Sequence, residues 1–190
     1  MKVLAITGSP RVESNTRRYV EHCLEVLGQH GLETELIALR EKKINPCLGC
    51  YACTKEKRCA QKDDFAEVLA AMESAQGIVL GSPVYLSSVA PEMMSLLARA
   101  TFVAHWNNKF LAGKVGGPIT VARRAGHNLA FSQLLLWFFI NGITVPGSTY
   151  WTVGMAGAGG AHDADQDAEG MQHVANFAEN MAKVMKKLYA

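Results

Sequence analysis

The chain has 190 residues, of which 49% are hydrophobic and 19% charged, enough for one domain with a sizeable core and short for two. Lys and Arg number 19 against 17 Asp and Glu, the signs are mixed along the chain, and no nucleic-acid-binding motif is present, so we do not expect a nucleic-acid partner. The longest apolar run, 134–140, is far shorter than the roughly 20 residues of a membrane-spanning helix, and the N-terminal apolar stretch is too short for a signal peptide. The sequence therefore predicts a soluble, cytoplasmic protein.

Apolar periodicity alternates between strand-like and helix-like segments, and no internal repeat is present. Strands are predicted at about 2–7, 33–39, 77–81, 115–121 and 144–153. Helices are predicted at about 16–29, 64–74, 91–106, 128–141 and 165–189. This alternation predicts a single α/β domain over residues 1–190, with a flavodoxin-like, doubly wound, five-stranded parallel sheet of order 2-1-3-4-5.

The turn between the first strand and the first helix has the composition of a phosphate site. In doubly wound folds ligands lie at the carboxyl ends of strands, where free N–H groups and the helix dipole favour an anion. Ser9, Ser14, Asn15 and Thr16 add hydroxyl and amide groups, and Arg11 adds a charged fork. The turn lacks G-x-G-x-x-G and G-x4-G-K-[ST], so a single monoester phosphate is favoured over a dinucleotide or a P-loop ligand. Helix capping by Ser14 or Asn15 is compatible with this interpretation.

Four of the five cysteines form a C-x2-C-x2-C-x5-C run in a loop at about 45–62. They are Cys47, Cys50, Cys53 and Cys59. A [4Fe-4S] cluster needs four converging thiolates, and two-residue spacers let one curled segment supply three of them, a curl that Gly49 favours. Structural zinc is the first alternative, although its commoner spacing separates two C-x2-C pairs by a dozen or more residues. Disulfides or inert thiols are the second, and a cytoplasmic compartment disfavours disulfides. Cys23 fits a small buried hydrophobe on the first helix.

Two more loops follow the third and fourth strands at the same sheet edge. In the segment 81–85, Pro83 fixes the turn and Tyr85 offers an aromatic face along which a planar ring system can lie. After the fourth strand, Arg123 and Arg124 can stabilise negative charge on a reduced flavin, and a solvated basic turn is the alternative.

The fourth predicted helix is apolar in nearly every direction around its axis, through Phe131 and the run 134–140. A surface helix of a small domain buries only one face, so another subunit or a large cofactor must cover the remainder. A homodimer is the leading interpretation, and deep burial within the monomer is the alternative.

The chain resembles the iron-sulfur flavoprotein family, within the flavodoxin-like group of NADPH-dependent FMN reductases. The resemblance rests on Gly8-Ser9-Pro10-Arg11 with Ser14-Asn15-Thr16, the cysteine run, and Gly81-Ser82-Pro83-Val84-Tyr85. It implies FMN, with its phosphate held by Ser9, Arg11, Ser14, Asn15 and Thr16 and its isoalloxazine ring near Pro83, Val84 and Tyr85. It also implies a [4Fe-4S] cluster on the four cysteines, in dimers or tetramers where a cluster approaches the flavin of a neighbouring subunit. Arg99 alone remains of a Leu-Lys then Asp-Arg pattern that relatives often carry in the third helix.

These features predict a flavin-dependent oxidoreductase that transfers electrons between a [4Fe-4S] cluster and FMN, with no catalytic side chain. The redox partner is expected to be ferredoxin or NAD(P)H, and the assembly a homodimer or homotetramer. The alternative is an NAD(P)H-dependent FMN or quinone reductase whose cysteine loop is unoccupied or structural. A flavin-free thiol or zinc redox sensor is a third hypothesis.

Overall fold

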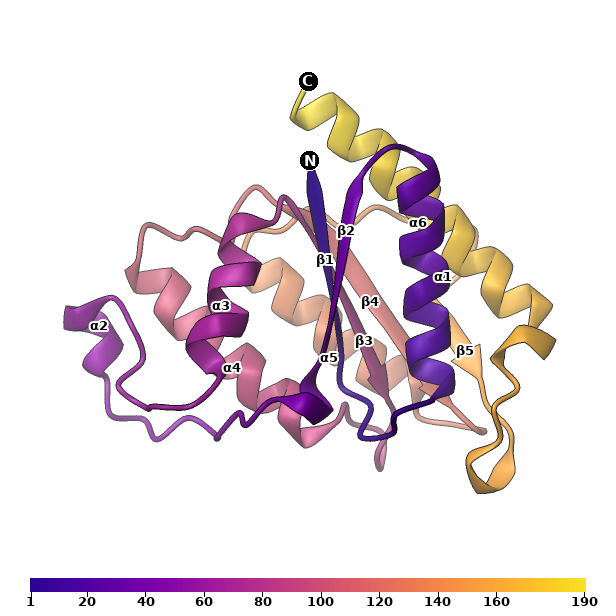
Figure 1. Ribbon diagram of the computed structural model, residues 1–190, viewed down its shortest axis with the longest axis horizontal. Helices are drawn as coiled ribbons and strands as arrows, with labels where there is room; N and C mark the ends of the chain where they lie inside the picture. Colours follow the sequence, from indigo (N-terminus) through magenta and orange to yellow (C-terminus); the bar gives the residue numbers. More distant parts are fainter.

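The computed structural model describes residues 1–190 and shows an all-parallel sheet of order β2-β1-β3-β4-β5 (Figure 1). Its strands are β1 (Lys2–Thr7), β2 (Glu33–Ala38), β3 (Gly77–Pro83), β4 (Val115–Ala122) and β5 (Val153–Met155). The predicted fold class and strand order are confirmed.

Helices cover both faces of the sheet (Figure 1). The α-helices are α1 (Asn15–Gln29), α2 (Ala52–Glu56), α3 (Phe65–Ser74), α4 (Pro91–Trp106), α5 (His127–Ile140) and α6 (Ala168–Leu188). Three single 3-10 turns are η1 (Leu39–Glu41), η2 (Ala158–Gly160) and η3 (Ala164–Gln166). No helix is both long and apolar enough to cross a membrane.

The alternation of side chains along the central strands divides the core into two layers. On β1, Leu4 and Ile6 pack with α3, α4 and α5 in a cluster of 24 buried residues. Val3 and Ala5 point to the opposite face and pack with α1 and α6 in a cluster of 20. Cys23 is fully buried in this second cluster, as expected for a small hydrophobe, and burial raises its pKa to about 12.

The predicted fifth strand, 144–153, is wrong over most of its length. Thr144 forms only an isolated bridge with Val115, and the chain then leaves the sheet until Val153 pairs with Thr120. Pro146 has no N–H to donate to a ladder, and a proline within an apparent strand marks an interruption. The last helix begins at Ala168 rather than near 165, because Asp167 caps it by accepting a hydrogen bond from the backbone N–H of Gly170.

Helix α5 buries one side and leaves much of its apolar surface exposed. Leu134, Trp137 and Phe138 are buried, whereas Phe139 is 81% exposed and Ile140 72%. The alternative of deep burial within the monomer is therefore wrong, and the exposed face needs another explanation.

Candidate functional site

Three loops meet at the carboxyl edge of the sheet. The N–H of Gly8, after β1, donates to the carbonyl of Gly81 in β3 at 2.8 Å, and the N–H of Val84 donates to Val121 of β4 at 2.9 Å. The loop after β4 approaches Val84 closely at Gly126, whose φ is +90°. A Cβ there would lie 2.9 Å from Val84 Cγ1 and 3.0 Å from Ser87 Cα, so glycine permits this contact.

The turn between β1 and α1 leaves backbone donors free at a helix N-terminus. Ser14 is the N-cap of α1, and its Oγ accepts from the N–H of Arg17 at 3.1 Å, which is the capping role considered from the sequence. The N–H groups of Asn15 and Thr16 donate no hydrogen bond within the chain. Ser9 and Thr16 are buried, and Ser9 Oγ accepts a long bond from the N–H of Arg11. The turn can therefore bind an anion chiefly through its main chain.

The side chain of Asn15 is not available to a ligand, because the segment 161–164 occupies it completely. Its Nδ2 donates to the carbonyl of Ala161 at 2.8 Å and to Asp163 Oδ1 at 2.7 Å. Its Oδ1 accepts from the N–H groups of Asp163 and Ala164, both at 3.0 Å. Asn15 thus joins the β1–α1 turn to a segment almost 150 residues away in sequence, a role that no local pattern in the sequence indicates.

The glycine-rich segment before α6 lies beside the predicted phosphate turn. A Cβ on Gly160 would come within 2.7 Å of Arg11 Nη1, so this segment packs against the exposed Arg11 guanidinium. Asp163 accepts from the N–H of Gly157, and this bond, with that from Asn15, holds the pKa of Asp163 below its ordinary value. Segments that are distant in sequence therefore shape the surroundings of the turn.

The turn that follows Pro83 and Val84 carries backbone strain. Tyr85 and Ser88 exchange two backbone hydrogen bonds, and between them Leu86 and Ser87 have φ of +49° and +66°. Such angles are uncommon outside glycine, and strained turns concentrate at functional sites. Leu86 is fully exposed and Tyr85 nearly half exposed, so the turn presents an apolar, partly aromatic surface at the sheet edge.

Arg123 and Arg124 are exposed and make no hydrogen bond or ion pair within the chain. The loop that carries them is anchored by the buried His127, whose Nε2 lies 3.2 Å from the carbonyl of Ala122 and 3.1 Å from that of Gly154. Because both partners are acceptors, Nε2 carries the proton. The arginines thus project from a fixed loop at the same edge as Tyr85.

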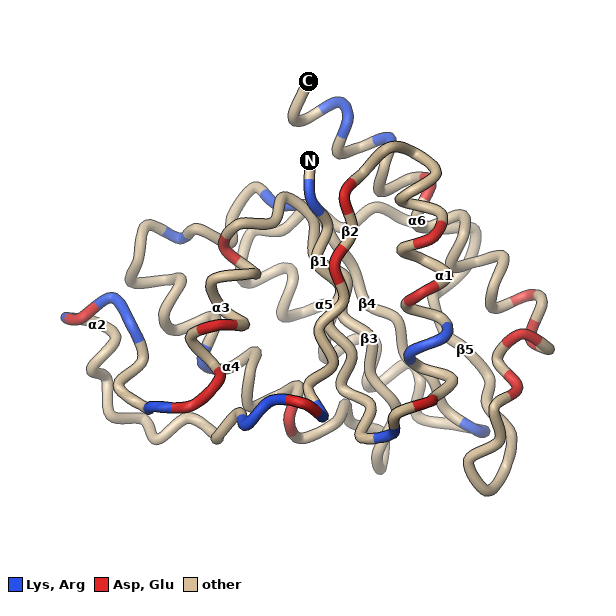
Figure 2. Tube along the Cα trace, viewed as in Figure 1, with Lys and Arg blue, Asp and Glu red and all other residues tan.

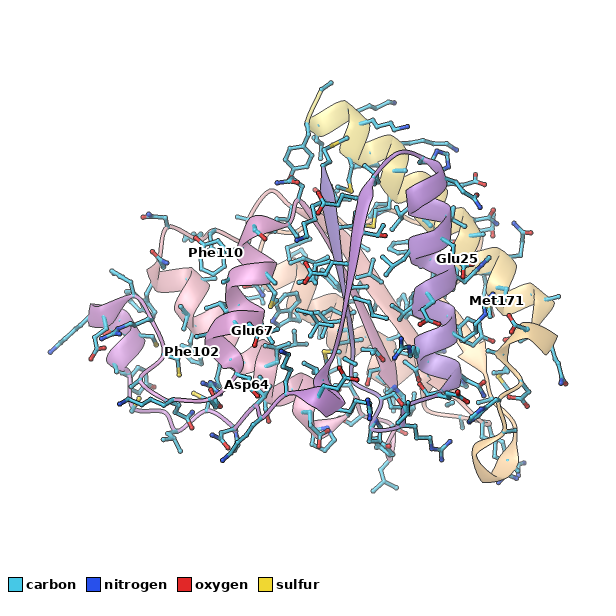
Figure 3. The ribbon with its side chains drawn as sticks, viewed as in Figure 1. Glu25, Asp64, Glu67, Phe102, Phe110 and Met171 are labelled. Carbon is cyan, nitrogen blue, oxygen red and sulfur yellow. The ribbon has the colours of Figure 1, made fainter.

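The four cysteines of the run line one cavity of about 60 Å³, several times the space that one water needs. The loop curls through left-handed backbone at Gly49, as expected, and also at Tyr51 and Lys57 on either side of α2. Tyr51 packs edge-on against Phe102 of α4, with ring centroids 6.4 Å apart. Figure 3 shows Phe102 on the side of α4 that faces α2.

The four thiols share one cavity but do not converge on a single point. Four ligands of one zinc ion must converge to about 2.3 Å, whereas each cysteine of a [4Fe-4S] cluster binds a different iron. No three His, Cys, Asp or Glu side chains are arranged to hold one metal ion, yet all four thiols surround the same cavity. Cys47 and Cys50 lie toward solvent, and Cys53 and Cys59 are partly buried.

A buried ion pair closes the base of the cysteine loop. Arg99 of α4 is 1% exposed and binds Asp63 through two bonds, Nη1 to Oδ2 at 2.6 Å and Nη2 to Oδ1 at 2.8 Å. The Arg99 guanidinium holds the pKa of Asp63 near 2, well below its ordinary value. Asp63 Oδ2 also accepts from the N–H of Asn45, so the pair joins both ends of the loop to α4.

Comparison with known sequences identifies the family of this chain. The family model of NADPH-dependent FMN reductases matches residues 1–158. An iron-sulfur flavoprotein of Methanocaldococcus jannaschii is 36% identical over 191 residues, which cover 98% of each chain. The chain belongs to the iron-sulfur flavoprotein family. Another iron-sulfur flavoprotein, from Archaeoglobus fulgidus, is 30% identical over 198 residues and 98% of each chain.

Solved structures support the fold of this iron-sulfur flavoprotein family member. RosB, solved with 8-demethyl-8-formylriboflavin-5'-phosphate, aligns with a TM-score of 0.70 at 20% identity, covering 98% of this chain and 81% of its own. A flavodoxin, WrbA-like protein from Agrobacterium tumefaciens gives a TM-score of 0.65 at 15% identity, covering 98% and 97%. At these identities the likeness concerns the fold alone.

Proposed function

We propose that this chain is an electron-transfer iron-sulfur flavoprotein, in which residues 1–190 form one FMN-binding domain that also holds a [4Fe-4S] cluster. Family membership supports a flavin-dependent oxidoreductase in general. The observation that carries the finer proposal is the single cavity lined by Cys47, Cys50, Cys53 and Cys59. When bound, the cluster supplies one-electron transfer and the flavin stores one or two electrons. No side chain needs to act as nucleophile or base.

The FMN phosphate is assigned to the β1–α1 turn. The free N–H groups of Asn15 and Thr16 and the adjacent Arg11 support this assignment, together with the buried Ser9. Asn15 contributes its backbone, since its side chain is engaged by the segment 161–164. The isoalloxazine ring is assigned to the strained turn at Pro83, Val84 and Tyr85, with Arg123 and Arg124 able to stabilise a negative charge on it.

The two cofactor sites lie apart within one chain. In Figure 1 the loop with α2 extends at the far left beyond α3 and α4, whereas the β1–α1 turn lies at the lower centre. A second subunit that brings its own flavin to the cysteine loop would shorten the electron path. The exposed apolar face of α5, with Leu136, Phe139 and Ile140, supports a homodimer or a homotetramer.

The surface around the cysteine loop is cationic. Lys55, Lys57, Arg58 and Lys62 are exposed there, and Figure 2 shows Lys and Arg on and after α2. Such a surface favours an anionic redox partner, and both an acidic ferredoxin and the phosphates of NAD(P)H meet this requirement.

Anaerobic purification with iron, sulfide and FMN quantified tests the proposal. We expect about four iron, four sulfide and one FMN per chain. The variant Cys50→Ala should lose the cluster and keep FMN, because the thiol is removed from one loop and the phosphate turn is untouched. Cys23→Ala is the matched control: its thiol is buried in the core and should not affect iron content. Flavin without iron after anaerobic reconstitution, or a full cluster in Cys50→Ala, would contradict the assignment.

A second candidate function is an NAD(P)H-dependent FMN or quinone reductase in which the cysteine loop is structural. The match to the NADPH-dependent FMN reductase model favours it. Stopped-flow reduction of the bound flavin by NADPH separates the two hypotheses, and no reduction at millimolar nucleotide would count against this second candidate.

A further inference from the structure

Arg99 is a buried cation whose four Nη N–H groups all donate to the cysteine loop and its two ends. It lies on α4 among apolar neighbours of the core, where an unpaired charge would be costly. Its Nη1 donates to the carbonyl of Asn45 at 3.0 Å and to Asp63 Oδ2, and its Nη2 donates to Asp63 Oδ1. The guanidinium carbon lies 4.0 Å from the centre of the Phe65 ring.

The remaining bond of Nη2 goes to sulfur. Arg99 Nη2 lies 3.2 Å from Cys59 Sγ, within the range of a hydrogen bond to a thiol or thiolate. Each Nη atom carries two N–H groups, and all four are accounted for by these four contacts, while Nε has no partner. The planar fork, fixed by Asp63 and stacked on Phe65, therefore leaves its last Nη2–H aimed at Cys59.

The four cysteines are not equivalent in this respect. Cys59 receives a charged side-chain donor that is shielded from solvent, whereas the exposed Cys47 accepts only from the neutral backbone N–H of Gly49, at 3.5 Å. Hydrogen bonds to ligand sulfurs are one of the protein's means of setting the potential of an iron-sulfur group. A donor stabilises the state with more negative charge on the sulfurs, which is the reduced state.

We propose that Arg99 is a positioning residue whose hydrogen bond to Cys59 raises the reduction potential of the cluster. The inference rests on the proposed [4Fe-4S] site. Asp63 balances the charge of Arg99, so the intact pair adds no net charge beside the cluster. Arg99→Gln removes the donor and also leaves the Asp63 carboxylate unpaired, whereas Arg99→Lys keeps the charge. Removal of the donor should leave the cluster in place but harder to reduce.

The test is a redox titration of the cluster, followed by electron paramagnetic resonance, in wild type, Arg99→Gln and Arg99→Lys. For Arg99→Gln we expect the ratio of reduced to oxidised cluster at a fixed ambient potential to fall about tenfold, equivalent to about 59 mV for one electron. Arg99→Lys keeps the charge and an N–H donor group but loses the planar fork, so its shift should be smaller. Arg58→Gln is the matched control, because it also removes a cation next to Cys59. The side chain of Arg58 is 80% exposed and contacts Glu56, so it gives no buried donor to the cluster. Its potential should remain near that of wild type.

Each outcome has one meaning. A wild-type protein without iron would overturn the proposed function and, with it, this inference. A wild-type cluster whose potential is unchanged in a fully loaded Arg99→Gln protein would overturn the inference alone. Loss of iron from both variants, with FMN retained, would also overturn it, since Arg99 would then only hold the loop. An equal shift in Arg58→Gln would assign the effect to net charge instead.

Discussion

Replacement of Asp63 by Asn should destabilise the protein strongly near neutral pH. The side chain of Asp63 has no exposed surface and forms two bonds to the buried Arg99. The pKa of Asp63 is about 2, held down chiefly by the Arg99 hydrogen bonds, against about 3.9 for an unfolded chain. A difference of nearly two pKa units corresponds to about 2–3 kcal/mol of stability at neutral pH.

The general cost of breaking a buried ion pair predicts a similar loss of stability. Removal of one partner of a buried ion pair costs about 3–5 kcal/mol, because the other charge remains buried without compensation. Asn keeps one oxygen that can accept from Arg99, so we expect a loss at the lower end, about 3 kcal/mol. The pKa of Asp63 is lower in the folded protein than in the unfolded chain. Its ionisation therefore stabilises the fold fully above the pKa of the unfolded chain, and this stabilisation is lost as the pH falls through the pKa of the folded protein. The difference between wild type and Asp63→Asn should therefore narrow between about pH 4 and pH 2.

Urea unfolding followed by circular dichroism at pH 7, 4 and 3 measures this difference. The double variant Asp63→Leu with Arg99→Met is the control, because an apolar replacement of both partners leaves no buried charge and should cost less than either single change. Unfolding free energies of wild type and Asp63→Asn that agree within about 0.5 kcal/mol at pH 7 would show that the ion pair does not stabilise the fold. A difference that persists unchanged at acid pH would refute the role of Asp63 ionisation.

Three further outcomes are expected. Ser14→Ala should lower the free energy of unfolding by about 1 kcal/mol through loss of the α1 cap, measured by urea denaturation, and an unchanged midpoint would contradict that role. Asn15→Ala removes four hydrogen bonds to the segment 161–164, so proteinase K should cleave faster between residues 156 and 164, and equal rates would show that the clamp is dispensable. Phe139→Glu should shift the protein toward monomer in sedimentation equilibrium. Leu188→Glu, at a 56% exposed position on α6, should leave the dimer intact. A dimer that survives Phe139→Glu would exclude α5 as the interface.

The fold could be predicted because its signals are local. Buried parallel strands appear as short apolar runs, and α4 begins at Pro91, a residue suited to a first helical turn, so its predicted range 91–106 is confirmed. The error at 144–153 arose because β-branched and aromatic residues on both sides of Pro146 suggest a single strand. In the structure this segment pairs with the sheet only at Thr144 and again from Val153. The sequence carries no signal for this interruption in pairing other than Pro146.

The candidate site was predictable in part. Cysteine spacing is enough to indicate that four thiols share one cavity, because the ligands lie close in sequence. The pairing of Arg99 with Asp63 spans 36 residues, so no local spacing predicts it. The sequence indicates only that a charged residue within an apolar helix needs a partner. Asn15 shows the opposite limitation: its residue type suits phosphate binding, but the segment 161–164 competes for the same side chain.

Helix α4 connects the cysteine loop to the exposed face of α5. Arg99 attaches the loop to the middle of α4, and two residues earlier the carbonyl of Leu97 accepts from Trp137 Nε1 of α5 at 3.0 Å. Both helices contribute to the same buried cluster, so they form a rigid unit. If α5 forms the subunit interface, the cysteine loop is fixed relative to the partner subunit through a path of packed side chains and two buried hydrogen-bonding residues. The distance between a cluster and the flavin of a neighbouring subunit would then be set by the core, and flexible surface loops would contribute little to it.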